Sequence, residues 1–251
     1  MHKTDLMGGF AKGLRVIEAF GEATPKLAIA DVSRSTGLDR ATARRCLLTL
    51  TELGYAHYDG KFFTLTPRIL RLGHAYLSAT SLPHIVQPFL DRLSEEVGQS
   101  ASVSVLDGTE IVYIARASHK RVMSINLMAG SRLPAYCASM GRVLLAALSE
   151  QDARLCLERT QIHAFTPFTR TDPDALMLEL ERVRNQGFAM IDQELELGLC
   201  SLAVPLLDEG GRTIAALNIG APAAQISADH MAECYLLSLQ ETARSLRPLL
   251  T

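Results

Sequence analysis

The spacing of apolar residues near the start of the chain predicts three short helices. Residues 10–21, 28–36 and 39–53 repeat an apolar position every three or four residues, which is the period of an α-helix. Gly37 lies between the second and third segments, where a residue that tolerates positive φ permits a sharp turn. Asp39 is placed to cap the third helix, because its side chain can accept a hydrogen bond from a free N–H group of the first turn.

The third segment has the two faces that a DNA-recognition helix needs. One face carries the apolar residues that should pack on the other helices, Ala43, Cys46, Leu47, Leu50 and Leu53. In the first helix the corresponding stripe is Leu14, Ile17 and Phe20. The other face carries residue types that contact base edges and phosphates, and the expected DNA contacts are Arg40, Ala41, Thr42, Arg44 and Arg45. The alternative is a solvated helix whose arginines contact only water.

After the third helix the pattern changes to a period of two. Residues 55–67 are expected to form two short strands with Asp59-Gly60 at the turn. A hairpin after three helices is the winged form of the helix-turn-helix, and Lys61 is then expected to contact the DNA backbone or minor groove. We therefore predict a DNA-binding domain over residues 1–66.

The rest of the chain mixes both periods. Residues 67–80 are expected to form a linker helix, and residues 81–251 a second domain. In that domain, helices are expected at 83–97, 138–148, 149–158, 173–186 and 229–250, and strands at 100–116 (a hairpin), 123–130, 188–192, 201–208 and 213–220. Interleaved strands and helices with several hairpins predict an α+β fold on a mostly antiparallel sheet.

The distribution of charged residues agrees with this division into two domains. The 251 residues carry a net charge of −2, but residues 1–80 hold 11 Lys and Arg against 7 Asp and Glu, whereas residues 81–251 hold 14 against 20. A basic first part suits a DNA-binding module joined to a body that does not touch phosphate. No run approaches the roughly 18–20 apolar residues of a membrane helix, and the start lacks the apolar segment of a signal peptide. We therefore expect a cytoplasmic protein without membrane contact.

Motifs for metal binding and catalysis are missing from the sequence. The five cysteines are odd in number and form no C-x-x-C pair, so neither a disulfide framework nor a zinc site is expected. G-x-S-x-G, H-E-x-x-H and P-loop patterns do not occur, and Arg142 stands where a hydrolase S-x-x-K motif starting at Ser139 would need lysine. Catalysis and a cofactor are therefore not expected. A redox regulator that senses through Cys137 or Cys200 stays open, since it would keep the DNA-binding role.

Motifs along nearly the whole chain resemble the IclR family of bacterial transcription regulators. The first part carries GGFAKGLRVIEAF, AIADVSRSTGLDRATARRCLLTLTELGY and YDGKFFTLTPRILRLG. The second part carries GSRLPAYCASMGRVLLAAL and the family's signature region, GFAMIDQELELGLCSLAVPL. The opening run and SINLMAGSRLPAYCASMGR are most similar to regulators of protocatechuate, 4-hydroxybenzoate and β-ketoadipate catabolism.

The resemblance implies properties that the residue pattern alone does not reveal. The second domain should be a GAF-like or PAS-like effector domain with helices around an antiparallel sheet. The protein should be a homodimer or a dimer of dimers that binds double-stranded operator DNA. A small organic acid, for this subgroup an aromatic acid or β-ketoadipate, should alter DNA affinity or the recruitment of RNA polymerase. A family member that responds to another small acid is the alternative.

In this family the ligand lies between the sheet and the segment that reads AGSRLPAYCASMGR here. The resemblance implies ligand contacts by Arg132, Ala138, Ser139, Met140, Asp192, Ser201 and Asn218. A helix that starts after Cys137 would offer free N–H groups to a carboxylate, and Ser139 adds a hydroxyl. Arg132 is either a bidentate partner of the carboxylate or part of a surface ion pair. Asp192 either orients a ligand hydroxyl or caps a turn.

The chain departs from the family pattern at two neighbouring positions. Many members have Arg-Cys where this chain has Cys200-Ser201. Aligning Cys200 with the family's cysteine would shift the strand register by one residue and turn the side chain to the opposite face of the sheet. The missing arginine also leaves the acidic run of Asp192, Glu194 and Glu196 without its expected partner.

Overall fold

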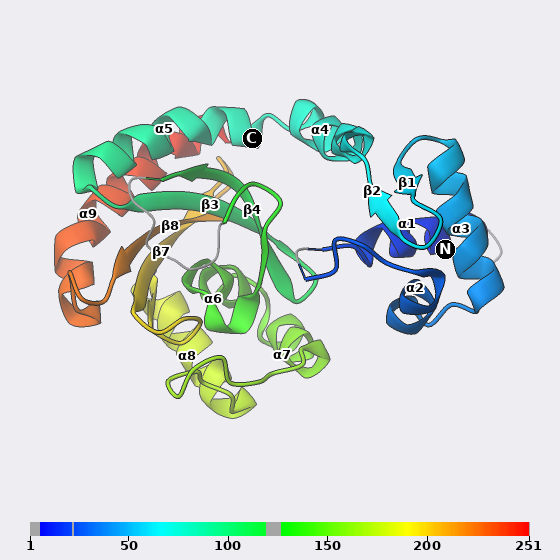
Figure 1. Ribbon diagram of the computed structural model, residues 1–251. Helices are drawn as coiled ribbons and strands as arrows, with labels where there is room; N and C mark the ends of the chain where they lie inside the picture. The colour runs from blue at the N-terminus through cyan, green and yellow to red at the C-terminus, as the bar shows by residue number, and fades with distance from the viewer. Residues whose placement is uncertain (1–5, 22, 119–126, 251) are drawn as a thin grey trace. The chain divides into compact units, whose positions relative to one another are not determined.

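The computed structural model describes residues 6–21, 23–118 and 127–250 (Figure 1). The chain divides into two compact units, Met1–Ala79 and Thr80–Thr251, each with its own hydrophobic core. Among the described helices, none is both long enough and apolar enough to cross a membrane.

The first unit packs three helices and a two-stranded sheet around one core. α1 (Gly8–Glu18), α2 (Ile29–Thr36) and α3 (Arg40–Glu52) are followed by β1 (Ala56–Tyr58) and β2 (Phe63–Leu65), which pair antiparallel. The buried side chains that hold these elements together include Val16, Val32, Leu47, Leu50 and Phe63. η2 (Pro67–Ile69) and α4 (Leu70–Ala79) end the unit. This order of elements confirms the predicted winged helix-turn-helix.

The turn between α2 and α3 depends on two residues that the sequence singled out. Gly37 adopts φ of +68°, a backbone conformation in which any other residue would be strained. The Asp39 carboxylate accepts a hydrogen bond from the Thr42 N–H at 2.8 Å and so caps α3. Hydrogen bonds from Thr42 also hold the pKa of Asp39 below its usual range, because they favour the ionised carboxylate.

Two burial predictions for this unit are wrong. Val16 enters the core and Ile17 and Phe20 pack against it, whereas Leu14 is 40% exposed. Leu53 follows α3 and is 52% exposed, although its spacing predicted burial. Both leucines belong to an apolar surface, which a helical period cannot distinguish from a core because both favour apolar residues.

The second unit is built on an antiparallel sheet. In the described residues its strands are β3 (Ser100–Asp107), β4 (Glu110–Ala117), β5 (Arg132–Pro134), β6 (Ala189–Asp192), β7 (Leu199–Leu207) and β8 (Thr213–Pro222). They lie in the order β5-β4-β3-β8-β7-β6, and every neighbouring pair is antiparallel. The predicted α+β class is confirmed.

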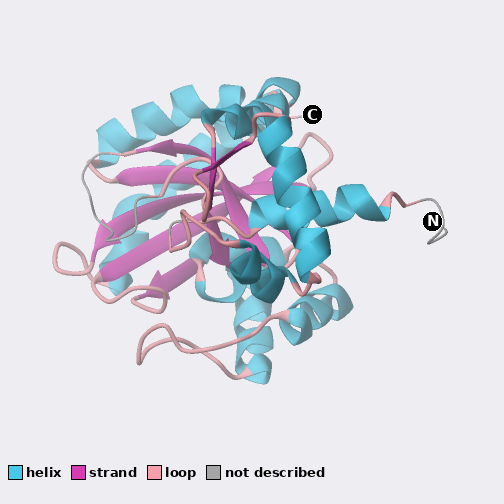
Figure 2. Cartoon of the chain, turned by 45° about the vertical axis from the view of Figure 1, so that its right-hand side comes forward, coloured by secondary structure: helices cyan, strands magenta, loops and turns pink. Residues whose placement is uncertain are grey.

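Helices cover both faces of this sheet (Figures 1 and 2). α5 (Leu82–Val97) and α9 (Ala228–Leu246) pack on one face, and η4 (Arg247–Leu249) follows α9. α6 (Ser139–Ala146), which follows η3 (Ala135–Cys137), packs on the other face. α7 (Glu150–Arg159) and α8 (Pro173–Gln186) complete that layer. The face toward α6 is called the inner face below.

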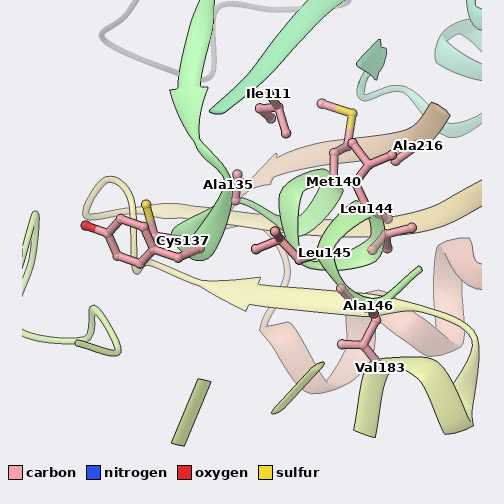
Figure 3. Close-up of a cluster of buried hydrophobic side chains, with 14 of the residues drawn as sticks. Ile111, Ala135, Cys137, Met140, Leu144, Leu145, Ala146, Val183 and Ala216 are labelled. Carbon is pink, nitrogen blue, oxygen red and sulfur yellow. The ribbon is translucent and has the colours of Figure 1, made fainter. Parts of the chain in front are cut away.

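α6 lies unusually close to the turn that precedes it. Met140, Leu144 and Leu145 fill the core around this helix (Figure 3). A Cβ atom at Gly141 would lie 2.1 Å from the carbonyl oxygen of Ala135, so only glycine permits this approach. The contact fixes where the helix begins relative to the sheet.

The strand predicted over residues 123–130 is wrong for residues 127–130, the part of it that the structure describes. Residues 123–126 lie outside the described residues, and 127–130 are not a strand but a turn with Gly130 at φ +90°. This turn leads into β5, which the pattern did not predict because only three residues are paired. Strand β7 begins at Leu199, two residues before its predicted start.

Candidate functional site

α3 presents a group of arginines on the surface of the first unit. Arg40, Arg44 and Arg45 are exposed, and so is Ala41. Among the described residues, no carboxylate lies within ion-pair distance of these three arginines. Like charges one helical turn apart, as at Arg40 and Arg44, disfavour a helix by about 0.2–0.5 kcal/mol. DNA phosphates would neutralise this uncompensated charge.

The other two expected DNA contacts differ in accessibility. Thr42 is only 7% exposed, with its hydroxyl oxygen 3.5 Å from Arg45 Nη2, so little of its side chain can reach DNA. Lys61 is exposed at the hairpin turn. The Asp59 carboxylate accepts hydrogen bonds from the N–H groups of Lys61 and Phe62 at 2.9 and 2.7 Å, which orders this turn.

A small cavity lies in the second unit, between the inner face of the sheet and the start of α6. Side chains from both sides line it: Ser100, Tyr113, Arg116, Leu133, Cys137, Ala138, Ser139, Met140, Ile191, Leu195, Leu199, Ser201, Asn218 and Gly220. Its volume is about 30 Å³, room for roughly one or two water molecules. Five of the expected ligand contacts come together here: Ala138, Ser139, Met140, Ser201 and Asn218.

The inner face of the sheet carries a row of polar side chains, and the two ends of this row, Arg116 and Asn218, line the cavity. Alternation along β3 places Ser102 on the inner face, while Ala101 and Val103 pack toward α5 and α9. The strand register sets Ser102 directly between Arg116 of β4 and Asn218 of β8. Side chains in register share a face, so these three form one polar row across the sheet.

Among the described residues that line the cavity, Arg116 is the one cation, and the sequence pattern did not identify it. Tyr113 of the same strand faces inward, so in a regular strand Arg116, three residues further on, would face α5 and α9. A β-bulge interrupts the pairing of β3 with β4, and Ile114 is the extra residue. The bulge turns Arg116 to the inner face.

Burial shapes the electrostatics of the cavity. It lowers the pKa of the Arg116 guanidinium and raises the pKa of Tyr113 to about 12. At neutral pH the arginine is still a cation and the tyrosine a neutral hydroxyl. Arg116 Nη1 donates to Ser102 Oγ at 3.0 Å and Nε donates to Ser118 Oγ at 3.1 Å. No carboxylate of the described chain lies within ion-pair distance of it.

Two polar atoms of the cavity wall are buried without a hydrogen-bond partner in the described part of the protein. They are Ser139 Oγ and Asn218 Oδ1, on residues that are 2% and 8% exposed. Ser139 is the first residue of α6, and no side chain caps the free N–H groups there. An unpaired buried polar group costs about 1–3 kcal/mol, so these atoms are suited to receive a ligand or water.

Two expected ligand contacts, Arg132 and Asp192, do not line the cavity. Arg132 lies at the edge of the sheet and makes surface ion pairs with Asp107 at 2.8 Å and Glu110 at 2.7 Å, so its charge is already compensated. Asp192 lies opposite Cys200, whose thiol donates to Asp192 Oδ1 at 3.2 Å. Cys200 packs toward α5 and α9, so this pair faces away from the cavity. The geometry favours a surface ion pair for Arg132 and a structural role for Asp192.

The acidic segment after β6 finds a partner that the sequence did not indicate. Arg142 Nη2 of α6 lies 2.7 Å from Glu194 Oε2, and the two side chains are 1% and 6% exposed. Glu194 also accepts a hydrogen bond from the Arg170 N–H at 2.9 Å. The pair therefore ties segment 193–198, which carries Leu195 of the cavity wall, to the helix on the other side of the cavity.

The two cysteines considered as redox sensors offer little reactive thiolate. Cys137 and Cys200 are buried, and burial raises the pKa of each thiol to about 12. Among the described residues, no group of three or more His, Cys, Asp or Glu side chains is placed to hold a metal ion.

A winged helix-turn-helix unit joined to an α+β unit with a small polar cavity is the organisation of a DNA-binding transcription regulator. Residues 10–60 match the IclR helix-turn-helix domain, and residues 74–247 match the bacterial transcriptional regulator IclR C-terminal domain. The chain therefore belongs to the IclR family, as its motifs predicted.

Individual relatives narrow the assignment within the IclR family. The chain is 44% identical to the Pca regulon regulatory protein of Pseudomonas putida over 243 residues, which cover 96% of this chain and 84% of that protein. A solved transcriptional regulator of Rhodococcus sp. RHA1 is 45% identical, with a TM-score of 0.80 and coverage of 96% and 97%. The inducer-binding domain of a PobR double mutant from Acinetobacter, in complex with 3-hydroxybenzoic acid, is 33% identical, with a TM-score of 0.64 and coverage of 67% and 98%. The chain is an IclR-type DNA-binding regulator, homologous to Pca and Pob aromatic-acid regulators, and not an enzyme.

Proposed function

We propose that this regulator controls a catabolic operon for an aromatic acid and that the acid binds in the cavity beside α6. The observation that carries the proposal is the mixed lining of the cavity, in which Arg116, Ser139 and Asn218 stand among apolar side chains. A ring that bears a carboxylate needs both donors for its charge and apolar contacts for its faces. The similarity to the Pca regulon protein and to the PobR domain that holds 3-hydroxybenzoic acid supports this ligand class. Protocatechuate and 4-hydroxybenzoate are the aromatic candidate effectors, and β-ketoadipate, an aliphatic dicarboxylate, is the third candidate.

Binding would move the cavity walls. The cavity holds about 30 Å³, whereas a cavity of about 150 Å³ accepts benzene. The start of α6 and segment 193–198 form walls that the Arg142–Glu194 pair holds together. A ligand that binds better when these walls are apart shifts the protein toward that state. The output would be a change in operator affinity or in recruitment of RNA polymerase.

Calorimetric titration tests the ligand class. We expect one of the three candidate acids to bind, and Ser139→Ala to weaken that binding about three- to tenfold, because one buried hydrogen bond is lost. Ser245→Ala on α9, outside the cavity, is the matched control and should bind like the wild type. Shikimate, quinate and glyoxylate serve as contrast acids. Binding of a contrast acid alone would assign the protein to another branch of the family. Binding of none of these acids would contradict the proposal.

The operator would be read by α3 and the hairpin. We expect Arg40→Ala and Arg45→Ala each to lower the affinity for operator DNA. An arginine that contacts bases should cost about tenfold or more in affinity when it is removed. An arginine that contacts phosphates should also reduce the salt dependence of binding when it is removed. Arg71→Ala on α4 is the control, since it removes an exposed arginine outside α3. Fluorescence anisotropy on an operator fragment selected from random-sequence DNA measures both effects. Unchanged affinity and salt slope in both variants would show that α3 does not contact DNA.

A regulator of chromosomal DNA would act in the cytoplasm.

A homodimer would bind such an operator, and the first unit offers a surface for it. A groove of about 690 Å³ lies between α1, the back of α3 and α4, and exposed apolar side chains surround it, among them Met7 just before α1, Phe10, Leu14 and Leu72. Thr42 and Arg45 of α3 lie at its rim, so the apolar side toward α1 is the part that a partner could cover. An apolar surface of this extent on a soluble unit usually contacts a partner. We propose that a second copy of the chain covers it, as an isologous two-fold contact would.

Sedimentation equilibrium tests the dimer. We expect Phe10→Asp to weaken self-association at least tenfold, because it would bury a charge in the interface. Leu237→Asp on α9 replaces an equally exposed apolar residue of the second unit and should leave the first unit's contact intact. A wild-type chain that stays monomeric at micromolar concentration would refute the contact.

The alternative of a redox regulator has less support. Its candidate sensors, Cys137 and Cys200, are buried, and their raised pKa leaves almost no thiolate at neutral pH.

A further inference from the structure

Leu48 of α3 is an exposed leucine that the packing of the first unit does not use. Its side chain is 36% exposed, and it is neither a member of the core nor one of the partly buried side chains that pack against the core. It also lies outside the apolar groove beside α1, which α3 lines with Arg45, Cys46, Thr49 and neighbouring residues. Leu48 therefore belongs to neither apolar surface of this helix.

The helical period places Leu48 in one row with two residues of the expected DNA-binding surface. Residues three, four and seven positions apart share a face of a helix, so Ala41, Arg44 and Leu48 follow one another along α3. All three are exposed. Ala43 and Leu50, which are buried in the core, lie on the other side of the helix. The row therefore faces away from the core of the unit.

The row is short enough to lie over a few base pairs in one major groove. Ala41 and Leu48 are seven residues apart, which is about 10 Å along a helix. Base pairs follow one another about every 3.4 Å, so the row spans roughly three base-pair steps. Residues near the start of a recognition helix are the ones that contact base edges. Glu52, one turn after Leu48, is exposed and carries a charge that phosphates repel, so the DNA-facing part ends before it.

The side chains of the row divide into one cation and two apolar groups. Arg44 can donate two hydrogen bonds to O6 and N7 of a guanine. Ala41 and Leu48 can neither donate nor accept, so a polar group of a base edge that they covered would lose its water without a replacement. The apolar group that base pairs present in the major groove is the C5-methyl group of thymine. The row therefore fits a thymine close to a guanine.

We infer that Leu48, together with Ala41, contacts the C5-methyl group of a thymine in the operator and makes the protein prefer thymine at that position. Arg44 reads a guanine within about three base pairs of this thymine. The inference rests on the proposed contact of α3 with operator DNA and adds to it a specificity residue and the base that this residue recognises. Contacts to phosphate strengthen binding to every sequence, whereas a methyl contact distinguishes thymine from the other bases.

Replacing single thymines of the operator with deoxyuracil tests this contact, because deoxyuracil pairs with adenine as thymine does and lacks only the C5-methyl group. Fluorescence anisotropy on the operator selected from random-sequence DNA should find a thymine at which the replacement weakens wild-type binding about fourfold, the effect of one buried methyl or methylene group. Leu48→Ala should bind the thymine operator about fourfold or more weakly and should not distinguish thymine from deoxyuracil at this position. Leu48→Met keeps an apolar side chain of similar volume and should keep the preference for thymine.

Leu155→Ala is the matched control, because Leu155 is a 39% exposed leucine on α7 of the second unit. It should bind both operators like the wild type, and melting curves should show that all variants are folded at the temperature of the measurement. An operator without a thymine of this kind, or a Leu48→Ala protein that keeps the full preference for thymine, overturns the inference.

The variant Arg44→Ala separates failure of the inference from failure of the proposed function. If Leu48→Ala keeps the thymine preference while Arg44→Ala binds the operator more weakly, the inference is overturned and the contact of α3 with DNA stands. Unchanged affinity in Arg44→Ala, Arg40→Ala and Arg45→Ala overturns both.

Discussion

Replacing Gly141 with alanine should destabilise the second unit by about 3 kcal/mol or more. The new Cβ would lie 2.1 Å from the Ala135 carbonyl oxygen and 2.4 Å from its Cα, and backbone atoms cannot rotate away as a flexible side chain can. Overpacking of a core costs about 1–3 kcal/mol when side chains can adjust, so a clash with backbone should reach or exceed that range. Thermal unfolding followed by circular dichroism should show a melting temperature lower by roughly 6–12 °C.

A second helical glycine separates this clash from the general effect of the substitution. A Cβ added at Gly73 of α4 would have no atom within 4 Å, so Gly73→Ala should be neutral or stabilising by about 0.5–1 kcal/mol. Equal melting temperatures for Gly141→Ala and wild type would mean that α6 does not depend on this contact. Because Ser139 and Met140 precede Gly141 directly, displacement of α6 should also weaken effector binding.

Removing one member of the buried Arg142–Glu194 pair should destabilise the same unit by about 3–5 kcal/mol. Arg142→Met would remove the guanidinium that lies 2.7 Å from the buried Glu194 carboxylate and leave only the half-exposed Arg170, whose Nε is 3.8 Å from Glu194 Oε1. It would also remove the hydrogen bond from Arg142 Nε to the Tyr136 carbonyl oxygen at 3.0 Å. The expected fall in melting temperature is roughly 6–20 °C. Segment 193–198 should open first, since this pair holds it to α6.

An exposed ion pair of the same kind provides the comparison. Arg154 and Asp174 lie 3.2 Å apart, with side chains 49% and 82% exposed, so Arg154→Met should change stability by at most about 1 kcal/mol. The double variant Arg142→Met, Glu194→Leu leaves no uncompensated charge and should be more stable than Arg142→Met alone. Additive effects of the two single substitutions would show that the pair is not coupled.

Sequence patterns predicted the DNA-binding unit closely because its structure depends on local signals. The helical period, the glycine turn and the Asp39 cap all act within a few residues, and α3 was placed to within one residue at each end. The hairpin turn at Asp59-Gly60 is equally local. Local signals failed for Leu14 and Leu53, whose exposure depends on what packs against each helix face.

The cavity was predicted in part. The motifs placed Ala138, Ser139, Met140, Ser201 and Asn218, which the fold brings together around one small space. The register expected at Cys200 and Ser201 also agrees with the structure, since Ser201 lines the cavity and Cys200 packs on the other face of the sheet. The family motif supplied this register, and strand alternation then sends the two neighbouring side chains to opposite faces of the sheet.

The sequence alone determined the family, the order of the elements, the bounds of α3 and the segments around the cavity, because each is encoded within a short stretch of residues. Only the tertiary structure decided which arginine serves the cavity. Arg132 lies in the motif but is paired at the sheet edge, whereas Arg116 enters because of a β-bulge that depends on pairing with a neighbouring strand. The tertiary structure also decided that Glu194 pairs with Arg142 and that Gly141 packs against the backbone of Ala135, because folding brings these residues together. The hydrophobic periodicity of a sequence predicts which face of a helix or strand a residue occupies, but it does not predict which residues pack against that face.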